Sequence, residues 1–297
     1  MTQNNIHKAG FVNIIGNPNV GKSTLMNRLV GERLSIITAK AQTTRHRIKG
    51  IVNGEDYQIV YSDLPGILTP AYKMQDMMMR FVKESLKDAD LILYLIECGE
   101  TNYNQEIIEK LQHLTIPILL VINKTDKANE ETITTTLSYW KNLLPKAETI
   151  EISALTGHHI NLLLEKIITL LPESPPFFSK DELTDRPIRF FISEIIREKI
   201  LLLYKKEIPY SVEVVIESFK EEEDMVRIGA MLYCERDSQK GIIIGNKGTA
   251  IKQLGIESRK AIEDFLEKHI FLDISVKVLK DWRNQDLVMK RFGYLHD

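Results

Sequence analysis

The sequence contains little cysteine and no long hydrophobic run. Its 297 residues include only two cysteines, Cys98 and Cys234, whose separation fits no zinc-binding or redox motif. We interpret both as small buried apolar side chains of a cytoplasmic protein. The longest apolar runs, Leu91–Ile96 and Ile116–Ile122, are far shorter than the roughly 20 residues that a helix needs to cross a bilayer. The polar segment Met1–Asn5 has no apolar core, so we expect no signal peptide and only peripheral contact with a membrane.

An excess of positive charge is also lacking. Lys and Arg number 39 against 41 Asp and Glu, a formal net charge of -2. This balance excludes a general basic coat for nucleic acid, although a local basic face remains open. Hydrophobic residues make up 43% and charged residues 27%, which is typical of a globular protein. At this length a single hydrophobic core usually gives way to two, and we therefore expect two domains.

Residues 1–171 alternate short apolar runs with segments of helical period, which indicates a parallel sheet covered on both faces. An exception is Asn53-Gly54, which stands between two β-rich runs and predicts a tight hairpin, hence one antiparallel edge strand. The predicted strands are Phe11–Ile15, Arg47–Val52, the overlapping runs Tyr57–Tyr61 and Ile59–Ser62, Leu91–Glu97, Ile116–Asn123 and Glu148–Ser153, and the predicted helices are Ser23–Val30, Met77–Lys87, Gln105–Leu114, Glu130–Leu144 and Ile160–Leu171.

The pattern changes after a proline-rich stretch. Residues 172–187 contain four prolines and read as a semi-rigid linker. Residues 188–297 then predict a smaller α+β domain with a different order of elements. Its predicted elements are a helix over Arg189–Tyr204, strands over Ser211–Phe219 and Met225–Tyr233, a glycine-rich turn, a helix over Thr249–Phe265 and a strand over Leu272–Val278.

A phosphate-binding loop follows the first predicted strand. The segment Gly16-Asn17-Pro18-Asn19-Val20-Gly21-Lys22-Ser23 fits G-x-x-x-x-G-K-[ST], and a helix containing Thr24 leaves it. Successive backbone N–H groups of such a loop wrap phosphates, and the helix N-terminus adds partial positive charge. In this motif Lys22 would bridge the β- and γ-phosphates, and the Ser23 hydroxyl would bind Mg²⁺.

A second motif points to guanine. Asn123-Lys124-Thr125-Asp126 directly follows an apolar strand. The Asp126 carboxylate can accept hydrogen bonds from both N1–H and the exocyclic N2–H of guanine. Adenine offers no such pair and would leave a buried charge unpartnered. Ser153-Ala154-Leu155, after the next strand, offers backbone N–H groups to the guanine O6, although this short string means little alone.

Two further segments are candidates for switches that sense the γ-phosphate. Asp63-Leu64-Pro65-Gly66-Ile67 ends a strand; Asp63 can hold Mg²⁺ through water, and the Gly66 N–H can contact the γ-phosphate. The same residues are typical of an ordinary β-turn, and the two interpretations coexist. Before the hairpin, Gln42-Thr43-Thr44-Arg45-His46 offers a threonine to Mg²⁺, and the residues alone do not decide between Thr43 and Thr44.

These four elements, in this order, resemble the translation-factor-class GTPases of the family that contains TrmE, Era and Der. The resemblance implies that Thr44 rather than Thr43 binds Mg²⁺, and that Lys22 and Thr44 are catalytic. Ile67 stands where Ras-like proteins have the glutamine that orients the attacking water, so catalytic assistance must come from elsewhere. Asn19 matches an asparagine that helps to hold K⁺ near the phosphates in this family. Its other interpretation, that it only tightens the loop, stays open.

The second domain carries a Gly-x-x-Gly turn, Gly245-Asn246-Lys247-Gly248, before a helix. Because neither glycine has a Cβ, such a turn lets another backbone approach closely. With the α-β-β-α-α-β order, it resembles a type II KH domain, in which this loop clamps about four nucleotides of a single strand. Lys247 would contact a phosphate, and Lys252, Arg259 and Lys260 would extend a basic rim.

Taken over the whole chain, the motifs resemble the Era family: an α/β P-loop GTPase domain with a mostly parallel sheet and one antiparallel edge strand (1–171), a linker (172–187) and a smaller α+β type II KH domain (188–297). The resemblance implies a monomeric switch that binds GTP, GDP and Mg²⁺, and K⁺ as a further cofactor. It also implies binding to the 3′ end of 16S rRNA, a role in 30S ribosomal subunit assembly and peripheral association with the inner face of the membrane. The alternative is a membrane-associated or tRNA-modification G protein whose C-terminal domain docks a partner. The tRNA-modification relatives carry a different partner domain and a C-terminal cysteine motif.

Overall fold

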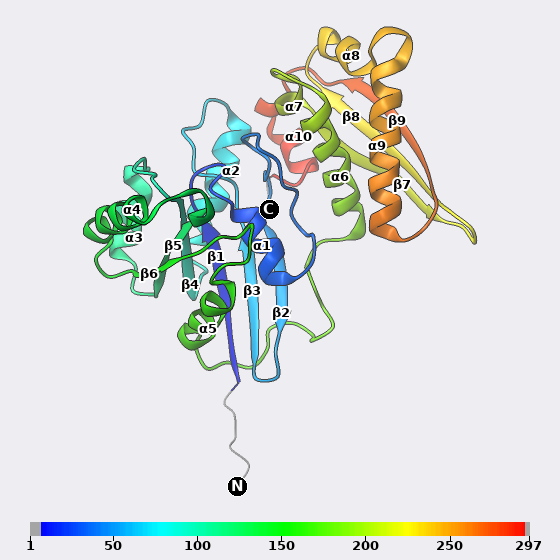
Figure 1. The fold of residues 1–297 in the computed structure, drawn as a ribbon. Coiled ribbons are helices and arrows are strands. Elements are labelled where there is room, and N and C mark those ends of the chain that lie inside the picture. The colour runs from blue at the N-terminus through cyan, green and yellow to red at the C-terminus, as the bar shows by residue number, and fades with distance from the viewer. Residues whose placement is uncertain (1–6, 295–297) are drawn as a thin grey trace. The chain divides into compact units, whose positions relative to one another are not determined.

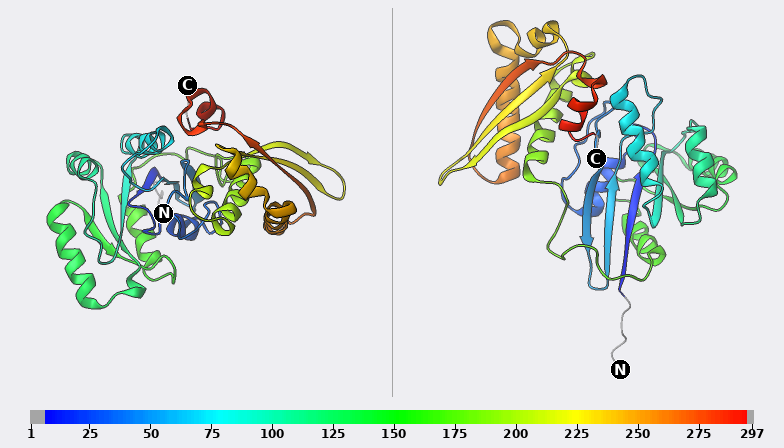
Figure 2. Two further views of the ribbon diagram at one scale, coloured as in Figure 1. Left: turned by 90° about the horizontal axis from the view of Figure 1, so that it is seen from above. Right: turned by 180° about the vertical axis from the view of Figure 1, so that it is seen from behind.

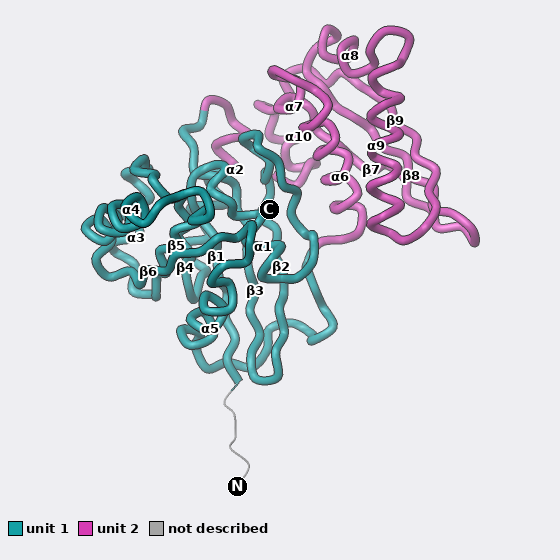
Figure 3. The backbone as a smooth tube through the Cα atoms, in the orientation of Figure 1, with its two compact units in different colours: residues 1–70, 78–185 teal, residues 71–77, 186–297 magenta. Residues whose placement is uncertain are grey.

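The computed structural model describes residues 7–294, which form two compact units (Figure 3). The first unit includes the chain up to Pro70 and Met78–Asp185; the second includes Ala71–Met77 and the chain from Arg186 onward. The segment Met1–Asn5, for which we expect no signal peptide, lies outside the described residues. Within residues 7–294, no helix is both long and apolar enough to cross a membrane.

The first unit is a six-stranded sheet with the order β2-β3-β1-β4-β5-β6. Only β2 is antiparallel to its neighbour. The strands are β1 Lys8–Ile15, β2 Ile48–Asn53, β3 Tyr57–Asp63, β4 Leu91–Glu97, β5 Ile118–Asn123 and β6 Glu148–Glu151, and the helices are α1 Lys22–Val30, α2 Lys73–Ser85, α3 Gln105–His113, η1 Thr125–Lys127, α4 Glu130–Leu143 and α5 Ile160–Leu170. This arrangement confirms the predicted fold class of the domain.

Helices cover both faces of this sheet. Residues of α2, α3 and α4 pack in one apolar cluster with Tyr94 of β4 and Leu120 of β5, whereas α1 and α5 lie on the opposite face (Figures 1 and 2). Strand β4 is apolar along nearly its whole length because side chains on both of its faces are buried. The parallel order brings the carboxyl ends of β1, β3 and β5 to one edge of the sheet, and each of the three nucleotide motifs begins there.

The hairpin between β2 and β3 exists, but its turn differs from the predicted one. Asn53 still pairs with Gln58, and the Gly54 N–H donates to the Tyr57 carbonyl oxygen, 2.9 Å away, so the chain reverses after Gly54. A Cβ on Gly54 would lie 2.2 Å from the Tyr57 ring. The glycine is therefore explained by contact with an aromatic side chain and not by a place in the turn.

The proline-rich stretch packs on the first unit instead of extending away from it. The Ile51 N–H of edge strand β2 donates to the Leu183 carbonyl oxygen over 2.8 Å, and the Thr184 hydroxyl donates to the Lys49 carbonyl oxygen over 2.7 Å. The buried Gln58 amide also donates to the Phe178 carbonyl oxygen over 2.9 Å. Residues 172–185 thus belong to the first unit, because they satisfy backbone groups of an edge strand that would otherwise be open.

The second unit has the element order α-β-β-α-α-β that the sequence predicts. Its sheet has the order β7-β8-β9, with β7 and β8 antiparallel and β8 and β9 parallel. Helices α6 and α9 pack on one face of it and supply apolar side chains to its core. The elements are α6 Ile188–Leu203, α7 Ile208–Ser211, β7 Glu213–Glu221, β8 Val226–Cys234, α8 Asp237–Ile244, η2 Asn246–Gly248, α9 Thr249–Leu266, β9 Ile270–Val278, η3 Trp282–Asn284 and α10 Asp286–Arg291.

Candidate functional site

The phosphate-binding loop holds its lysine inward. The loop joins β1 to α1, and the Lys22 ammonium donates to the carbonyl oxygens of Gly16 and Asn17 over 3.0 and 2.8 Å. The Asn17 amide is in turn held by the Glu100 carboxylate over 2.7 Å, and the Asn19 amide donates to the Ala39 carbonyl oxygen over 3.2 Å. The phosphate loop is therefore held by hydrogen bonds both to the segment after β4 and to the loop that leads to the first switch.

Burial shifts the pKa of this lysine strongly. Lys22 is 6% exposed, and loss of solvent lowers its pKa to about 8, against the opposing pull of the Asp63 and Glu100 carboxylates. An ammonium ion that has lost most of its water is poorly compensated by two carbonyl oxygens. A bound anion would therefore interact strongly with the desolvated ammonium group of Lys22.

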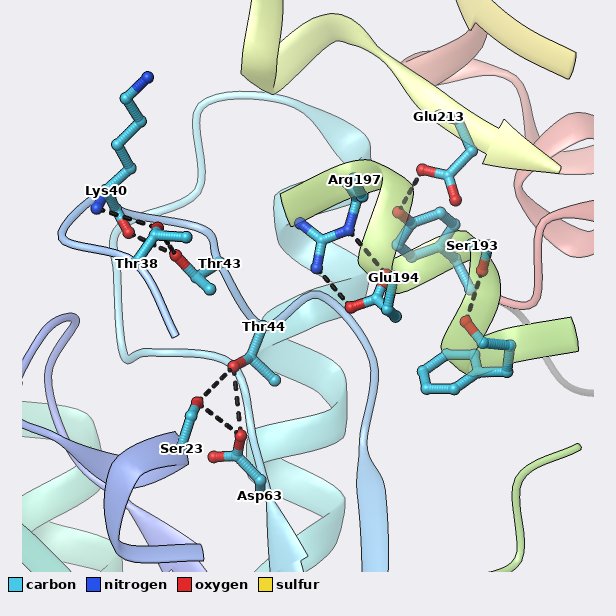
Figure 4. Close-up of polar contacts among 12 residues, drawn as sticks. Ser23, Thr38, Lys40, Thr43, Thr44, Asp63, Ser193, Glu194, Arg197 and Glu213 are labelled. Atoms are coloured by element: carbon cyan, nitrogen blue, oxygen red, sulfur yellow. Dashed lines mark hydrogen bonds and ion pairs between the residues drawn. The ribbon is translucent and has the colours of Figure 1, made fainter. Parts of the chain in front are cut away.

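Two hydroxyls and a carboxylate meet beside the loop (Figure 4). The Ser23 hydroxyl of α1 donates to Asp63 Oδ2 at the end of β3 over 2.7 Å. The Thr44 hydroxyl lies 3.3 Å from the same Asp63 oxygen and 3.0 Å from the Ser23 hydroxyl. Thr43 points elsewhere, because its hydroxyl donates to the Lys40 carbonyl oxygen over 2.7 Å. The geometry thus places Thr44, and not Thr43, in this cluster.

The cluster fits a hard divalent cation. Asp63 is fully buried, its Oδ1 has no hydrogen-bond partner among the described residues, and burial raises its pKa. Two hydroxyl oxygens and one carboxylate are donors of the kind that Mg²⁺ prefers when phosphate oxygens complete its shell. Within residues 7–294, no group of three or more His, Cys, Asp or Glu side chains could hold a metal ion. The fit therefore rests on hydroxyl oxygens and one acid.

One cavity of about 310 Å³ joins the phosphate loop to the first switch. Among the residues predicted for the site, its lining includes Pro18, Asn19, Gly21, Lys22, Ser23, Thr24, Gln42, Thr43, Thr44, Gly66 and Lys124. Other predicted residues are buried and do not line it: Val20, Arg45, His46, Leu64, Pro65 and Ile67. The tight packing of these residues fixes the backbone on which the lining residues stand.

Asn123 connects three of the predicted motifs. Its amide donates to the Val20 carbonyl oxygen over 2.8 Å, and its carbonyl oxygen accepts from the Ala154 N–H over 2.9 Å. Gly21 faces the same amide: its φ is +103°, and a Cβ there would lie 2.3 Å from Asn123 Nδ2. Asn123 therefore holds the phosphate loop and the two base-binding loops together, and Gly21 leaves the space that this requires.

Asp126 is held with Ser153 at the end of the neighbouring strand. The Ser153 hydroxyl donates to Asp126 Oδ1 over 2.6 Å, and both residues line a separate cavity of about 310 Å³. Lys124 donates to Glu97 over 2.6 Å, which fixes its aliphatic stem beside the phosphate cavity. Leu155 is 65% exposed. The Ser153 hydroxyl thus fixes one oxygen of the Asp126 carboxylate at the edge of this cavity.

The Gly-x-x-Gly turn of the second unit has left-handed backbone at three of its four residues. Gly245 has φ +73°, Lys247 +49° and Gly248 +78°, and Gly248 caps the N-terminus of α9. A Cβ on Gly245 would lie 2.8 Å from the Ala250 backbone nitrogen, whereas a Cβ on Gly248 would meet nothing within 4 Å. Asn246 and Lys247 are exposed at the tip. The turn thus needs glycine at its first position for space and presents open backbone at its last.

A groove of about 360 Å³ lies between α9 and β9. Lys252 and Arg259 stand at this groove, as predicted for a basic rim, whereas Lys260 is exposed but does not line it. Sequence analysis did not find the apolar lining, which is formed by Ile251, Gly255, Ile256, Leu272 and Ile274. A usable signal was Gly255, because a glycine inside a predicted helix lowers helix propensity and can have a packing or functional reason. In the structure a Cβ there would meet nothing within 4 Å, which leaves the groove open.

Comparisons with known proteins match both units of the chain. A family model described as "50S ribosome-binding GTPase" matches residues 11–124, and a model described as "KH domain" matches residues 207–283. The GTPase Era of Geotalea daltonii is 44% identical over 99% of this chain and 100% of its own length. That of Staphylococcus epidermidis is 40% identical over 98% of each chain.

The chain belongs to the Era family of GTPases. Two solved Era structures agree with the model at a TM-score of 0.91 and 36% identity. One is an Aquifex aeolicus Era variant bound to GDP and aluminium fluoride, which covers 97% of this chain and 100% of its own. The other is an Era complex with MgGDPNP and nucleotides 1506–1542 of 16S ribosomal RNA, covering 98% and 100%. As an Era-family protein, the chain binds GTP and hydrolyses it.

Membership of the Era family gives meaning to two features of the nucleotide site. Ile67, which stands where other GTPases have a water-orienting glutamine, is 4% exposed and packs in the apolar core of the first unit. It therefore cannot contact a water molecule at the γ-phosphate. The acids Glu97 and Glu100, which hold Lys124 and Asn17, were missed by sequence analysis because nothing in the short segment after β4 distinguishes them from surface residues.

Proposed function

We propose that this Era-family GTPase binds the single-stranded 3′ end of 16S rRNA in its KH groove and that its GTP cycle assists assembly of the 30S ribosomal subunit. The observation that carries this proposal is that one chain has a phosphate cavity with a hydroxyl–carboxylate cluster and a glycine-bounded groove with a basic rim. The Era complex with a 16S rRNA fragment supports it. A cytoplasmic location, peripheral membrane association and a monomeric state stay predictions.

In the proposed nucleotide complex, backbone N–H groups of Gly66 and of residues 16–24, except Pro18, which has none, contact the phosphates. Lys22 exchanges its two carbonyl partners for phosphate oxygens. The negative phosphate oxygens compensate the positive charge of the buried ammonium group better than neutral carbonyl groups do. Asp126 accepts the two N–H groups on the edge of guanine, and Leu155 offers its backbone N–H group to O6. The Ala154 N–H reaches O6 only by giving up its hydrogen bond to Asn123. GTP is thus selected by its base and bound by its phosphates.

Ser23, Thr44 and Asp63 are the residues that would hold Mg²⁺ beside these phosphates. The ion, when bound, neutralises charge that develops on the phosphate oxygens. Ser23 is fixed on α1, whereas Thr44 belongs to the loop before β2, so the cluster ties that loop to the rigid phosphate site. Loss of the γ-phosphate removes one attachment of this loop and of Gly66, which makes residues 42–46 and 63–67 the proposed switches.

We further propose that K⁺ at Asn19 compensates for the missing glutamine. Asn19 lines the phosphate cavity with φ +65°, and its amide reaches the Ala39 backbone in the loop before the first switch, so a cation there would contact both the phosphate loop and that loop. We expect GTP hydrolysis at equal ionic strength to be at least several-fold faster in KCl than in NaCl, because a monovalent cation would replace an arginine finger. GTP affinity, measured in both salts, is the control, and equal rates would refute the proposal.

The KH groove suits unpaired RNA. Its apolar lining can receive the faces of bases that are free to leave a stack, and its mouth carries Lys252 and Arg259 seven residues apart on α9, two turns of one helix face. Lys247 projects from the exposed turn at the start of the same helix. A duplex would present neither free bases nor a backbone narrow enough to follow the turn. We therefore expect single-strand selectivity.

The experiment is a binding titration of a fluorescent single strand from the 3′ end of 16S rRNA. We expect the wild-type protein to bind the single strand at least tenfold more tightly than the same strand in a duplex. Gly248→Asp should weaken binding at least tenfold, because it places a carboxylate where a phosphate would sit. A Cβ at this position meets nothing within 4 Å, but the φ of +78° strains any side chain, so GTP binding and an unfolding curve of the variant check that it folds.

Gly241→Asp is the matched control. Gly241 is an exposed glycine of α8 whose Cβ would meet nothing within 4 Å, so the same substitution adds the same charge outside the turn. Both variants should bind GTP as the wild type does. Failure of the wild-type protein to bind the single strand, or equal binding by the Gly248 and Gly241 variants, would contradict the proposed RNA site.

A further inference from the structure

A second serine lies behind the proposed Mg²⁺ cluster. Ser35 stands in the loop between α1 and the first switch and is 1% exposed. Its hydroxyl is fully buried without a hydrogen-bond partner among the described residues, and the same holds for Oδ1 of Asp63. A buried hydroxyl without an acceptor and a buried carboxylate oxygen without a donor are both costly, and each supplies what the other lacks.

The backbone of Ser35 is fixed by a residue of the same helix that presents Ser23. Asn27 lies one turn after Ser23 on α1, so the two side chains share a face of the helix. Its side-chain oxygen accepts from the N–H groups of Leu34 and Ser35 over 3.0 and 2.8 Å, and its amide donates to the Ser35 carbonyl oxygen over 2.7 Å. Three hydrogen bonds therefore set the position of Ser35 relative to the cluster.

The Ser35 hydroxyl is near the Asp63 carboxylate. Like the hydroxyls of Ser23 and Thr44, it lies among the side chains that surround this carboxylate. Asp63 Oδ2 already accepts hydrogen bonds from the hydroxyls of Ser23 and Thr44. Oδ1 is the oxygen left for Ser35, reached directly or through one buried water.

We propose that Ser35 is a positioning residue for Asp63: it holds Oδ1 so that Oδ2 faces Ser23 and Thr44. Asn27 places it there, and so connects α1 to the metal cluster by a second route besides Ser23. The inference rests on the proposed Mg²⁺ site. Partners that orient a metal-binding carboxylate commonly change metal affinity when removed, although they never contact the metal.

The test is a titration of Mg²⁺ against the dissociation rate of a fluorescent GDP analogue. We expect Mg²⁺ to slow this dissociation in the wild-type protein, and the concentration for half of the effect then reports the affinity of the site. We expect Ser35→Ala to raise that concentration roughly tenfold. In excess EDTA, the dissociation rate of the variant should equal that of the wild type, because Ser35 does not contact the nucleotide.

Ser258→Ala is the matched control. Ser258 is also fully buried, with a hydroxyl that has no partner among the described residues, but it lies on α9 in the second unit. We expect it to leave the Mg²⁺ titration unchanged. An unchanged titration in Ser35→Ala overturns the proposal, and so does faster dissociation of equal size with and without Mg²⁺, which would mean general damage to the pocket. If the wild-type rate itself ignores Mg²⁺, the proposed metal site fails instead.

Discussion

At the scale of single residues, the nucleotide site is built from groups whose charge is poorly compensated. Lys22 keeps an ammonium group in a desolvated loop, and Asp63 keeps a carboxylate in a buried cluster. Burial lowers the pKa of Lys22 and raises that of Asp63, so in both cases it favours the neutral form. Each group is therefore less favourable in the folded chain than in water. The triphosphate and its cation supply the missing opposite charges, which is how binding free energy becomes available at this site.

The pKa of Lys22 predicts how GTP affinity depends on pH. Its pKa is about 8 in the folded chain, against 10.5 for a lysine in water. The unfolded chain therefore binds more protons between about pH 8 and 10.5, so this residue's contribution to the free energy of unfolding rises with pH across that window. GTP requires the protonated amine. Its affinity should be level below about pH 7.5 and fall above pH 8, by up to tenfold per pH unit.

Calorimetry in two buffers with different heats of ionisation tests this directly at pH 8.5. Binding of GTP should take up a substantial fraction of one proton, because the phosphates raise the pKa of Lys22 again. Lys22→Met should bind weakly and take up less. Proton uptake that is zero, or the same in both proteins, would show that Lys22 is already charged at that pH.

At the scale of elements, sequence patterns predicted best where side chains alone decide the structure. Strand β4 begins and ends at the predicted residues, Leu91 and Glu97, because side chains on both of its faces are buried and the apolar run shows its full length. Strand β1 instead begins at Lys8, three residues before the predicted start. Lys8 continues the pairing with Tyr57, and its ammonium reaches the carbonyl oxygens of Ile168 and Thr169 in α5. Such distant partners leave no local pattern.

The candidate sites show the same division. The phosphate loop, Asp63, Asp126 and the Gly-x-x-Gly turn were predictable, because backbone geometry and fixed chemistry restrict their residues. Ser35 was not predictable as a partner of Asp63, since its importance depends on a loop fixed by three hydrogen bonds to Asn27. The groove lining also escaped, because it combines residues from α9 and β9.

The expected α-β-β-α-α-β order includes a helix before the Gly-x-x-Gly turn, but the bounds of this short helix, α8, were not predicted, for a related reason. It contains Gly241 and three successive isoleucines and reads as part of a turn, yet the Gln239 side chain caps its start by accepting the N–H groups of Glu235 and Arg236 over 2.9 and 3.2 Å. Glycine lowers helix propensity by only about 1 kcal/mol, which a cap of this kind offsets. Helix propensity therefore predicted a turn where the Gln239 side chain, by accepting backbone N–H groups, stabilises the start of a helix.

At the scale of the whole molecule, the division of the chain into units is informative. Residues 63–67 of the second proposed switch belong to the first unit, yet Ala71–Met77, four residues further, belong to the second. Two residues of that segment contact the C-terminal part of the second unit. The Tyr72 ring lies under the Arg283 guanidinium at 4.4 Å, and Lys73 pairs with Asp286 at 2.6 Å. An exposed ion pair contributes little by itself. The chain nevertheless gives the second switch a short covalent connection to residues of the RNA-binding unit.

This connection predicts reciprocal coupling between nucleotide and RNA. If the switches change when the γ-phosphate is lost, the affinity for a 16S 3′-end strand should differ between the forms bound to GDP and to a non-hydrolysable GTP analogue, by about 5- to 150-fold. The RNA strand must then change the ratio of the affinities for GDP and for the GTP analogue by the same factor. Tyr72→Ala should bring that factor close to one while binding of each ligand alone is retained, because it removes the ring under Arg283 and leaves both sites intact. Equal RNA affinity in the two nucleotide forms of the wild type would refute the coupling. A full factor in Tyr72→Ala would show instead that the signal does not pass through Ala71–Met77.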